Sequence, residues 1–435
     1  MSAKRLDDSR PCRLRGVAFV VPGFDAPGGM EGQARRLARA LAGHGVPVTY
    51  VTTAPQGAPL PAREVLGLVE VFRVPVLTAV DWTTSLDLLE LTCLGLLAAR
   101  RERVDVVYSV HHTIGAVAAR VGRALGAPVV VKLAGGGASG DARTLIASPR
   151  RARYAAALRG VTRLVAISDA IAAEARDLLG VPAERLVRIP NGVDLEAFKP
   201  DPAPARGERV VFLGRLAREK RVDVLLDAFA QVARARPAAT LDLGGDGPER
   251  AALEARAARL GLGGRARFLG LVDDPAALLR GAAALALPSA SEGLSNALLE
   301  AMSSGVAVVA TRIPGTDEVV RDGEEGLLVA PDDAGALAAA LERLLGDPTL
   351  ARRLGEGGRR RAEAAFDLAA VAERHALLFE ALKDERRAPA RVSPPALARA
   401  ALDALARTGR DATLSTARIV RGRVARLARG VVGGA

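Results

Sequence analysis

Short apolar runs alternate with amphipathic segments through the first half of the chain. Continuous apolar runs are typical of strands buried on both faces of a parallel sheet. Between these runs, the apolar positions repeat at the helical period at residues 30–41, 114–125 and 169–179. The alternation predicts parallel βα units in a first domain over residues 14–200. The predicted strands are residues 16–22, 46–53, 104–110, 128–133, 162–167 and 186–189.

A second series of the same kind follows residues 191–207, whose Pro-rich second half predicts an interdomain linker. It predicts a second domain over residues 205–365, so the fold class is α/β, with two Rossmann-like, doubly wound domains facing one cleft. In such sheets, ligands bind at the carboxyl ends of the strands. The predicted strands are 209–214, 240–243, 266–269, 282–287, 306–310 and 326–329, and the helices are 222–235, 249–260, 275–279, 333–345, 350–364 and 368–382.

Composition narrows the class of protein further. The chain has 435 residues, 49% of them hydrophobic, which is enough for two buried cores. Aromatic residues are only 3%, which argues against stacking platforms for single-stranded nucleic acid. Two cysteines, Cys12 and Cys93, cannot build a disulfide framework, and residues 1–11 lack a signal-peptide pattern. We therefore expect a cytoplasmic protein without a transmembrane span.

The net charge of +12 is concentrated at the end of the chain. Residues 385–435 contain eleven Arg and three acidic residues, which leaves about +4 for the rest. The body is therefore not expected to bind nucleic acid. The tail is either disordered or a basic amphipathic helix, because Val420, Val424, Leu427 and Val431 form one stripe. In the second case it would hold the protein at the inner face of an anionic membrane.

One stretch, residues 287–305, carries a candidate anion site. An apolar strand ends at Pro288, a polar loop follows, and a helix begins near Ser295 and Asn296. Unpaired backbone N–H groups at such a helix N-terminus attract anions. Glu292 in the loop and Glu300 in the helix bracket the site. They could hold two ends of an extended ligand, or be ordinary surface glutamates.

Two cations follow the first strand of the second domain. Arg215 and Lys220 lie in the loop at its carboxyl end, where they could neutralise a diphosphate and stabilise a leaving group. The chain contains no Asp-x-Asp sequence that could hold Mg²⁺, so these cations are expected to replace a metal. The alternative is a solvated run of charges from Arg218 to Arg221.

Two features of the first domain are weaker signals. Gly28 and Gly29 lie in the first βα turn, where glycine permits close approach of a phosphate, although a plain tight turn has the same sequence. His111 and His112 follow the strand at 104–110. A metal site there is not expected, because adjacent side chains point apart and no third ligand is near in sequence. Either histidine could simply fill space.

Taken together, these motifs resemble glycosyltransferase family 4, whose members are retaining enzymes with the GT-B fold. The resemblance covers residues 16–382. The motifs that carry it are Gly28-Gly-Met-Glu31, Val165-Ala-Ile-Ser-Asp169, Ile189-Pro-Asn-Gly-Val-Asp194, Leu213-Gly-Arg-Leu-Ala-Arg-Glu-Lys220, Gly244-Gly-Asp-Gly-Pro248, Glu292-Gly-Leu-Ser-Asn-Ala-Leu-Leu-Glu300 and Gly326-Leu-Leu-Val329.

The resemblance implies roles for these residues. Arg215 and Lys220 would hold the nucleotide diphosphate, Glu300 the ribose, and Glu292 the donor sugar. The resemblance also places one of the two histidines, His111 in preference to His112, against the donor sugar. The chain has Tyr108-Ser-Val-His-His112 where the family often has His-x-His. The remaining donor-binding candidates are Gly28, Gly29, Asn191, Leu294, Ser295 and Asn296, and the acceptor-binding candidates are Glu31, His112 and Lys132.

The implied function is transfer of a sugar from a nucleotide sugar, by family frequency a UDP-hexose, with retention and without metal or cofactor. The acceptor would be a carbohydrate or a lipid-linked molecule in polysaccharide or glycolipid synthesis. The family also implies that residues 366–384 form a helix packing back toward the first domain. Alternative functions are a GT-B sugar-nucleotide epimerase, or a non-catalytic nucleotide-sugar-binding protein.

Overall fold

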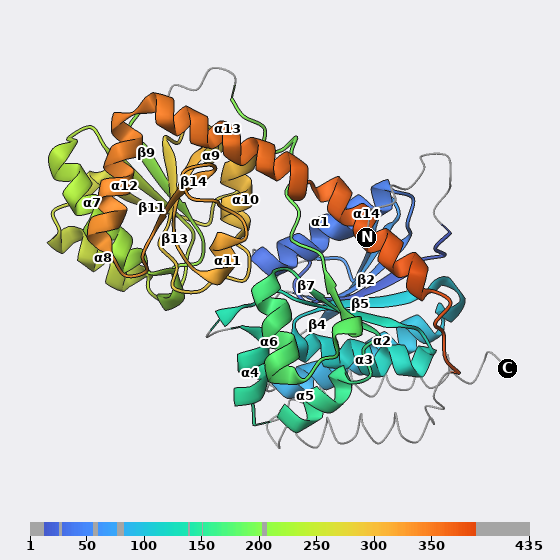
Figure 1. The fold of residues 1–435 in the computed structure, drawn as a ribbon. Helices are drawn as coiled ribbons and strands as arrows, with labels where there is room; N and C mark the ends of the chain where they lie inside the picture. The colour runs from blue at the N-terminus through green and yellow to red at the C-terminus, as the bar shows by residue number, and fades with distance from the viewer. Residues whose placement is uncertain are drawn as a thin grey trace.

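The computed structural model describes residues 13–25, 28–54, 60–75, 82–137, 140–149, 151–201 and 207–388. These residues form two α/β domains side by side, each built around one sheet (Figure 1). The cysteine Cys12 and most of the basic tail, from residue 389 on, lie outside the described residues.

The N-terminal domain contains an eight-stranded sheet in the order β3-β4-β2-β1-β5-β6-β7-β8. All neighbours are parallel except the antiparallel pair β3 and β4. The strands are β1 (Val17–Val20), β2 (Val48–Ala54), β3 (Arg63–Leu66), β4 (Val69–Pro75), β5 (Val106–Val110), β6 (Val129–Leu133), β7 (Arg163–Ala166) and β8 (Leu186–Arg188).

Helices cover both faces of this sheet because alternate residues of each strand point to opposite sides. In β1, Phe19 contacts one apolar cluster and Ala18 contacts another. The Phe19 side is covered by α1 and α14, and the other side by α2, α3 and α5 (Figure 1). The helices are α1 (Gly29–Gly43), α2 (Trp82–Ala98), α3 (His112–Leu125), α4 (Asp141–Ala147), α5 (Arg151–Leu158), α6 (Asp169–Leu179) and α14 (Leu368–Leu382).

The C-terminal domain is a six-stranded, fully parallel sheet in the order β11-β10-β9-β12-β13-β14. Helix α12 packs on α7 and on the strands beside it, and α13 packs on α10 and β13. The strands are β9 (Arg209–Leu213), β10 (Thr240–Gly244), β11 (Ala266–Gly270), β12 (Ala284–Leu287), β13 (Ala307–Thr311) and β14 (Gly326–Val329). The helices are α7 (Val222–Ala235), α8 (Arg250–Arg259), α9 (Pro275–Arg280), α10 (Asn296–Ser303), α11 (Pro314–Asp317), α12 (Ala334–Gly346) and α13 (Pro348–Ala365).

The chain passes between the domains twice, and the two crossings lie side by side. Val193, on the first crossing, donates its N–H to the carbonyl of Phe366 at 2.8 Å. Its carbonyl accepts from the N–H of Leu368 at 3.0 Å, and both partners lie on the second crossing. After this point α14 returns to the N-terminal domain and packs on α1 (Figure 1). Its apolar side chains Phe379 and Leu382 are almost fully buried, and burial of such a side chain stabilises a fold by about 1.5–3 kcal/mol.

The apolar runs correctly predict the parallel strands of both sheets except β4, and they predict none of the elements between residues 54 and 103. Here the structure contains β3, β4 and α2. Strand β3 is short and alternates between exposed and half-buried residues, so it has no apolar run to detect. Among the described residues, none of the helices is both long and apolar enough to span a membrane.

Candidate active site between the two domains

A cleft of about 840 Å³ opens between the carboxyl ends of the strands of both sheets. It collects nearly all of the side chains proposed from the sequence, from segments far apart in the chain. Of the predicted residues, His112 is the exception, because it does not line the cleft. The predicted residues that do line it are Gly28, Gly29, Glu31, His111, Lys132, Asn191, Arg215, Lys220, Glu292, Leu294, Ser295, Asn296 and Glu300.

Lys220 and Glu292 form an ion pair inside this cleft. Lys220 ends a 3₁₀ turn, Arg218–Lys220, that connects β9 to α7. Its Nζ donates to Glu292 Oε1 at 2.6 Å, and the Ser289 hydroxyl donates to the same oxygen at 2.8 Å. The side chain of Glu292 is only 8% exposed. The carboxylate therefore fixes the position of the Lys220 ammonium near the carboxyl end of β9.

Arg215 is also paired, but at a more exposed position. Its guanidinium donates to Glu219 Oε1 at 2.6 Å, and two-thirds of its side chain is exposed. Glu219 lines the cleft as well, and its pKa is lowered because backbone and Arg215 hydrogen bonds outweigh burial, which alone would raise it. Sequence reasoning missed Glu219, although it lies four residues after Arg215, the spacing of a helical ion pair.

The loop before α10 contacts the N-terminal domain directly. A Cβ at Gly293 would lie 2.1 Å from the carbonyl oxygen of Ala134, so only glycine permits this approach. The Ser291 hydroxyl donates to the carbonyl of Gly136 at 2.8 Å. Two glycine-containing loops, one from each domain, therefore close one end of the cleft.

Asn296, the first residue of α10, connects three segments across the cleft. Its side-chain amide donates to the carbonyl of Gly29 at 3.0 Å. Its amide oxygen accepts from Gln33 Nε2 and from Asn191 Nδ2, each at 2.9 Å. The Gly28–Gly29 turn is thereby held against the N-terminus of α10, and the free N–H groups of that helix lie next to it. Gln33 is a further residue that sequence reasoning missed.

Glu300 lies deeper in the cleft and faces Arg36 of α1. The two side chains approach to 3.7 Å, which is too long for a strong hydrogen bond. Burial raises the pKa of Glu300 to about 7, although the charge of Arg36 opposes the shift. Burial also lowers the pKa of Arg36, although the charge of Glu300 opposes that shift. The pair therefore joins the domains weakly.

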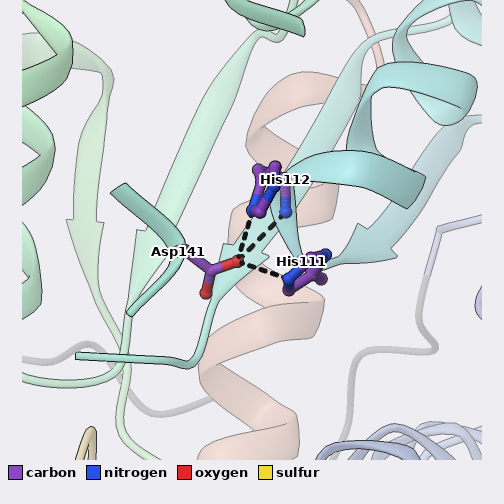
Figure 2. A group of neighbouring side chains, drawn as sticks. All are labelled: His111, His112 and Asp141. Atoms are coloured by element: carbon purple, nitrogen blue, oxygen red, sulfur yellow. Dashed lines mark hydrogen bonds and ion pairs between the residues drawn. The ribbon is translucent and has the colours of Figure 1, made fainter. Parts of the chain in front are cut away.

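His111 turns the chain from β5 into α3 with an unusual backbone. It is the N-cap of α3 with φ at 63°, in the left-handed region that non-glycine residues rarely adopt. Its Nδ1 accepts the N–H of Thr113 at 3.3 Å, so the neutral ring carries its hydrogen on Nε2. Nε2 lies 3.6 Å from Asp141 Oδ1 (Figure 2). His111 is thus the histidine that faces the cleft.

His112 has a different environment. It is 2% exposed, and its Nδ1 lies 3.2 Å from Asp141 Oδ1 (Figure 2). The expectation that the two adjacent side chains point apart is wrong, and Asp141, 29 residues from His112 in sequence, joins them in the fold. The two rings lie 4.0 Å apart between centroids, and ligand atoms of His111, His112 and Asp141 all lie within 4.8 Å of one another. The backbone φ at His111 brings them together, and no sequence pattern signals it.

The Asp141 carboxylate accepts four hydrogen bonds beside the two histidines. Oδ1 accepts from the N–H and Nδ1 of His112, and Oδ2 accepts from the N–H groups of Ala134 and Gly135 at 2.8 and 2.9 Å. Burial alone would raise the pKa of Asp141, but these hydrogen bonds and the His111 ring lower it on balance. With both oxygens already accepting, the carboxylate is suited to positioning the histidines. A cation held here would displace at least one of these donors.

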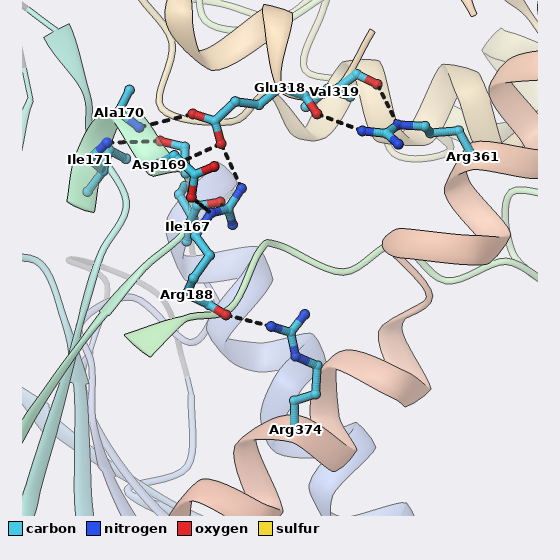
Figure 3. A network of polar contacts seen from close by, with 10 residues as sticks. Ile167, Asp169, Ala170, Ile171, Arg188, Glu318, Val319, Arg361 and Arg374 are labelled. Carbon is cyan, nitrogen blue, oxygen red and sulfur yellow. Dashed lines mark hydrogen bonds and ion pairs between the residues drawn. The ribbon is translucent and has the colours of Figure 1, made fainter. Parts of the chain in front are cut away.

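A second contact between the domains lies outside the lining of this cleft (Figure 3). The Glu318 carboxylate, just after α11, accepts from the backbone N–H groups of Asp169 and Ala170 at 2.7 and 3.0 Å. It also pairs with Arg188 at 2.7 Å. Asp169 and Ala170 begin α6, so a carboxylate from one domain caps a helix of the other.

Comparison with known proteins agrees with this architecture. The profile of Glycosyltransferase Family 4 matches residues 27–197, and that of Glycosyl transferases group 1 matches residues 207–347. A D-inositol 3-phosphate glycosyltransferase of Frankia alni is 34% identical over 306 residues, which cover 63% of this chain and 74% of that relative.

Two solved structures are similar over 84% of the chain. Sucrose-phosphate synthase from Thermosynechococcus elongatus has 25% identity and a TM-score of 0.72, with 99% of that chain covered. Anabaena Alr3699/HepE, solved with UDP and glucose, has 23% identity and a TM-score of 0.69, also with 99% covered. By contrast, the chain spans between 21% and 56% of the length of the first four curated relatives.

Two Rossmann-like domains with a cleft between their strand ends, together with these matches, define a glycosyltransferase of the GT-B type. Within that class, the chain belongs to glycosyltransferase family 4.

Proposed function

We propose that the protein is a retaining glycosyltransferase that uses a nucleotide sugar, most simply a UDP-hexose. The observation that carries this proposal is the arrangement across the cleft. Lys220 and Arg215 at the end of β9, and the N-terminus of α10, face the Gly28–Gly29 turn of the other domain. This arrangement suits a diphosphate, which needs cations, free N–H groups and close backbone approach.

In the proposed mechanism, the diphosphate binds between these groups, and Lys220 and Arg215 stabilise the negative charge that develops as it leaves. Glu292 is occupied by Lys220 and Ser289, so we assign it to holding Lys220 and contacting donor hydroxyls. The proposal therefore uses no carboxylate nucleophile. The acceptor attacks from the face that the diphosphate leaves, and the leaving phosphate oxygen takes its proton. His111 would lie against the donor sugar.

One comparison supports the choice of donor, because Alr3699/HepE was solved in complex with UDP-glucose. For this chain we propose an acceptor that is a carbohydrate or a lipid-linked molecule, bound on the N-terminal side of the cleft near Glu31 and Lys132. Synthesis of a polysaccharide or a glycolipid is the corresponding biological role.

The test is incubation of the purified protein with a panel of nucleotide sugars, followed by detection of the released nucleotide and the anomer of the sugar. A retaining transferase slowly hydrolyses its donor and releases the sugar with the donor's anomeric configuration. An epimerase would instead yield a second nucleotide sugar, and a binding protein would release nothing. Release of the inverted anomer would contradict the retaining mechanism.

A further inference from the structure

Two cations lie in the cleft away from the pair assigned to the diphosphate. Lys132 is near the end of β6, next to His111, whose N–H donates to the Lys132 carbonyl at 2.9 Å. Its side chain points to the face of the sheet that α1 and α14 cover. There it lies close enough to Arg36 of α1 and His375 of α14 to interact with both electrostatically.

Lys132 is buried, and no described residue provides a counter-charge for it. The residue is only 4% exposed, yet it lines the cleft. Within the described part of the chain, its ammonium makes no hydrogen bond or ion pair. Burial and the charge of Arg36 lower the pKa of Lys132 to about 7. An unpaired ammonium in such a place is costly, and a bound anion would relieve the cost.

The guanidinium of Arg36 also has few hydrogen-bond and ion-pair partners. Its carboxylate neighbours are Glu300, at 3.7 Å, and Asp194, which attracts it without forming an ion pair. Its Nε has no hydrogen-bond partner among the described residues. Guanidinium groups bind phosphate and carboxylate oxygens well because their donors form a planar fork. Two incompletely paired cations therefore converge on one part of the cleft, and both belong to the N-terminal domain.

We propose that Lys132 and Arg36 form a subsite for an anionic group of the acceptor, either a phosphate or a carboxylate. This inference rests on the proposed function. The donor diphosphate has cations of its own, Arg215 and Lys220, on the C-terminal domain. Lys132 adjoins His111 on the opposite domain, where the acceptor is proposed to bind. The subsite thus selects acceptors such as sugar phosphates or uronic acids over neutral sugars.

The test measures binding of model acceptors to the full-length protein saturated with UDP, by isothermal titration calorimetry. Glucose, glucose 6-phosphate and glucuronate share a ring and differ in charge. We expect the wild type to bind at least one anionic sugar tenfold or more tightly than glucose. The tighter of the two identifies the anionic group. In Lys132→Met the preference falls to about twofold or less, whereas the exposed-lysine control Lys199→Met keeps it.

Arg36→Met provides a second, independent variant, because the Arg36 side chain is partly exposed and its loss is tolerated better than loss of the fully buried Lys132. We expect it to lose most of the preference as well. Equal binding of charged and neutral sugars by the wild type would overturn the inference, as would an unchanged preference in both variants. Displacement of UDP by glucose 6-phosphate would assign the cations to the donor instead and also overturn it. Failure of the wild type to bind UDP would overturn the proposed function first.

Discussion

At the scale of single residues, the main finding is that each cation proposed to bind the donor diphosphate is paired with a carboxylate. Lys220 is held by Glu292, and Arg215 by Glu219. Such pairing keeps the charges in place for a ligand, since a positioned charge does not have to be reorganised when negative charge develops.

We therefore expect Lys220→Ala and Arg215→Ala each to lower sugar transfer about a hundredfold while leaving the fold intact. Removal of one preorganised charge from a leaving group typically costs about 2.7–4 kcal/mol. Steady-state rates at saturating donor, with urea unfolding as the check on folding, measure this effect. Arg218→Ala, three residues from Arg215 and absent from the cleft lining, is the matched control. Near-native rates in either active-site variant would remove the diphosphate assignment.

Activity should also survive excess EDTA. The cations proposed to bind the diphosphate are side chains, and both oxygens of Asp141 beside His111 and His112 already accept two hydrogen bonds each. The measurement is the transfer rate before and after chelation. Loss of activity that Mg²⁺ or Mn²⁺ restores would show that the cluster, or another site, holds a metal after all.

His375 of α14 makes stability depend on pH. It is fully buried, and burial lowers its pKa to about 3, from about 6.5 in the unfolded chain. Between these values only the unfolded chain binds the proton, so stability is complete above pH 6.5 and falls as the pH decreases. At pH 5 the loss from this group is about 2 kcal/mol.

The measurement is urea unfolding at pH 7 and pH 5 for the wild type and for His375→Gln, which can still donate to the carbonyl of Val371. We expect the variant to lose about 2 kcal/mol less than the wild type between the two pH values. Other titrating groups cancel in this difference. Equal losses in the two proteins would show that His375 does not titrate as its burial requires.

The sequence predicts a site residue when that residue lies in a loop directly after a predicted strand. It does not predict a residue that reaches the site only through tertiary contacts. Arg215 and Lys220 follow an apolar strand directly, so their place at the cleft follows from topology. Asp141 is a single acidic residue in a region without an apolar run, and only the fold brings it to His111 and His112. Arg36 likewise looks like one more surface arginine on an amphipathic helix.

At the scale of elements, the most informative contact is the capping of α6 by Glu318. The carboxylate satisfies two N–H groups at the start of the helix and pairs with Arg188 (Figure 3). Because Glu318 belongs to the other domain, these bonds form only when the domains are together. The capping therefore contributes to closure of the cleft.

We expect Glu318→Ala to favour an open arrangement, since charge-assisted hydrogen bonds of this kind contribute about 1–3 kcal/mol. Small-angle X-ray scattering should show a larger radius of gyration, and the donor KM should increase about tenfold with a smaller change in kcat. Asp317→Ala is the control, because Asp317 pairs with Arg312 within its own domain. An unchanged radius and KM in Glu318→Ala would show that other contacts hold the domains together.

Elements also differ in how well their pattern predicts them. Parallel strands such as β5 and β6 are buried on both faces and appear as unbroken apolar runs. The hairpin of β3 and β4 lies at the edge of the sheet, where polar and apolar residues alternate. Helix α2 is apolar without a strong helical periodicity, so its sequence does not distinguish it from a buried strand.

At the scale of the whole molecule, the uneven charge leads to a prediction about location. The basic residues after residue 388 lie outside the described structure, and the sequence alone suggests contact with an anionic surface, with about 1 kcal/mol from each cation near the membrane. We expect full-length protein to co-sediment with anionic vesicles at physiological salt, and a truncation to residues 1–387 not to. Equal binding by the two proteins, or binding by neither, would contradict the prediction.

The return of α14 to the N-terminal domain has a consequence for the order in which the protein can assemble. A chain emerging from the ribosome generally folds from its N-terminal end, domain by domain. Here Tyr108 and Phe19, in the first domain, belong to an apolar cluster that is completed by Val371, Ala376 and Phe379 near the end of the described chain. The first domain to be synthesised is therefore the last to be completed. Part of its apolar core stays exposed until the second domain and α14 have been synthesised.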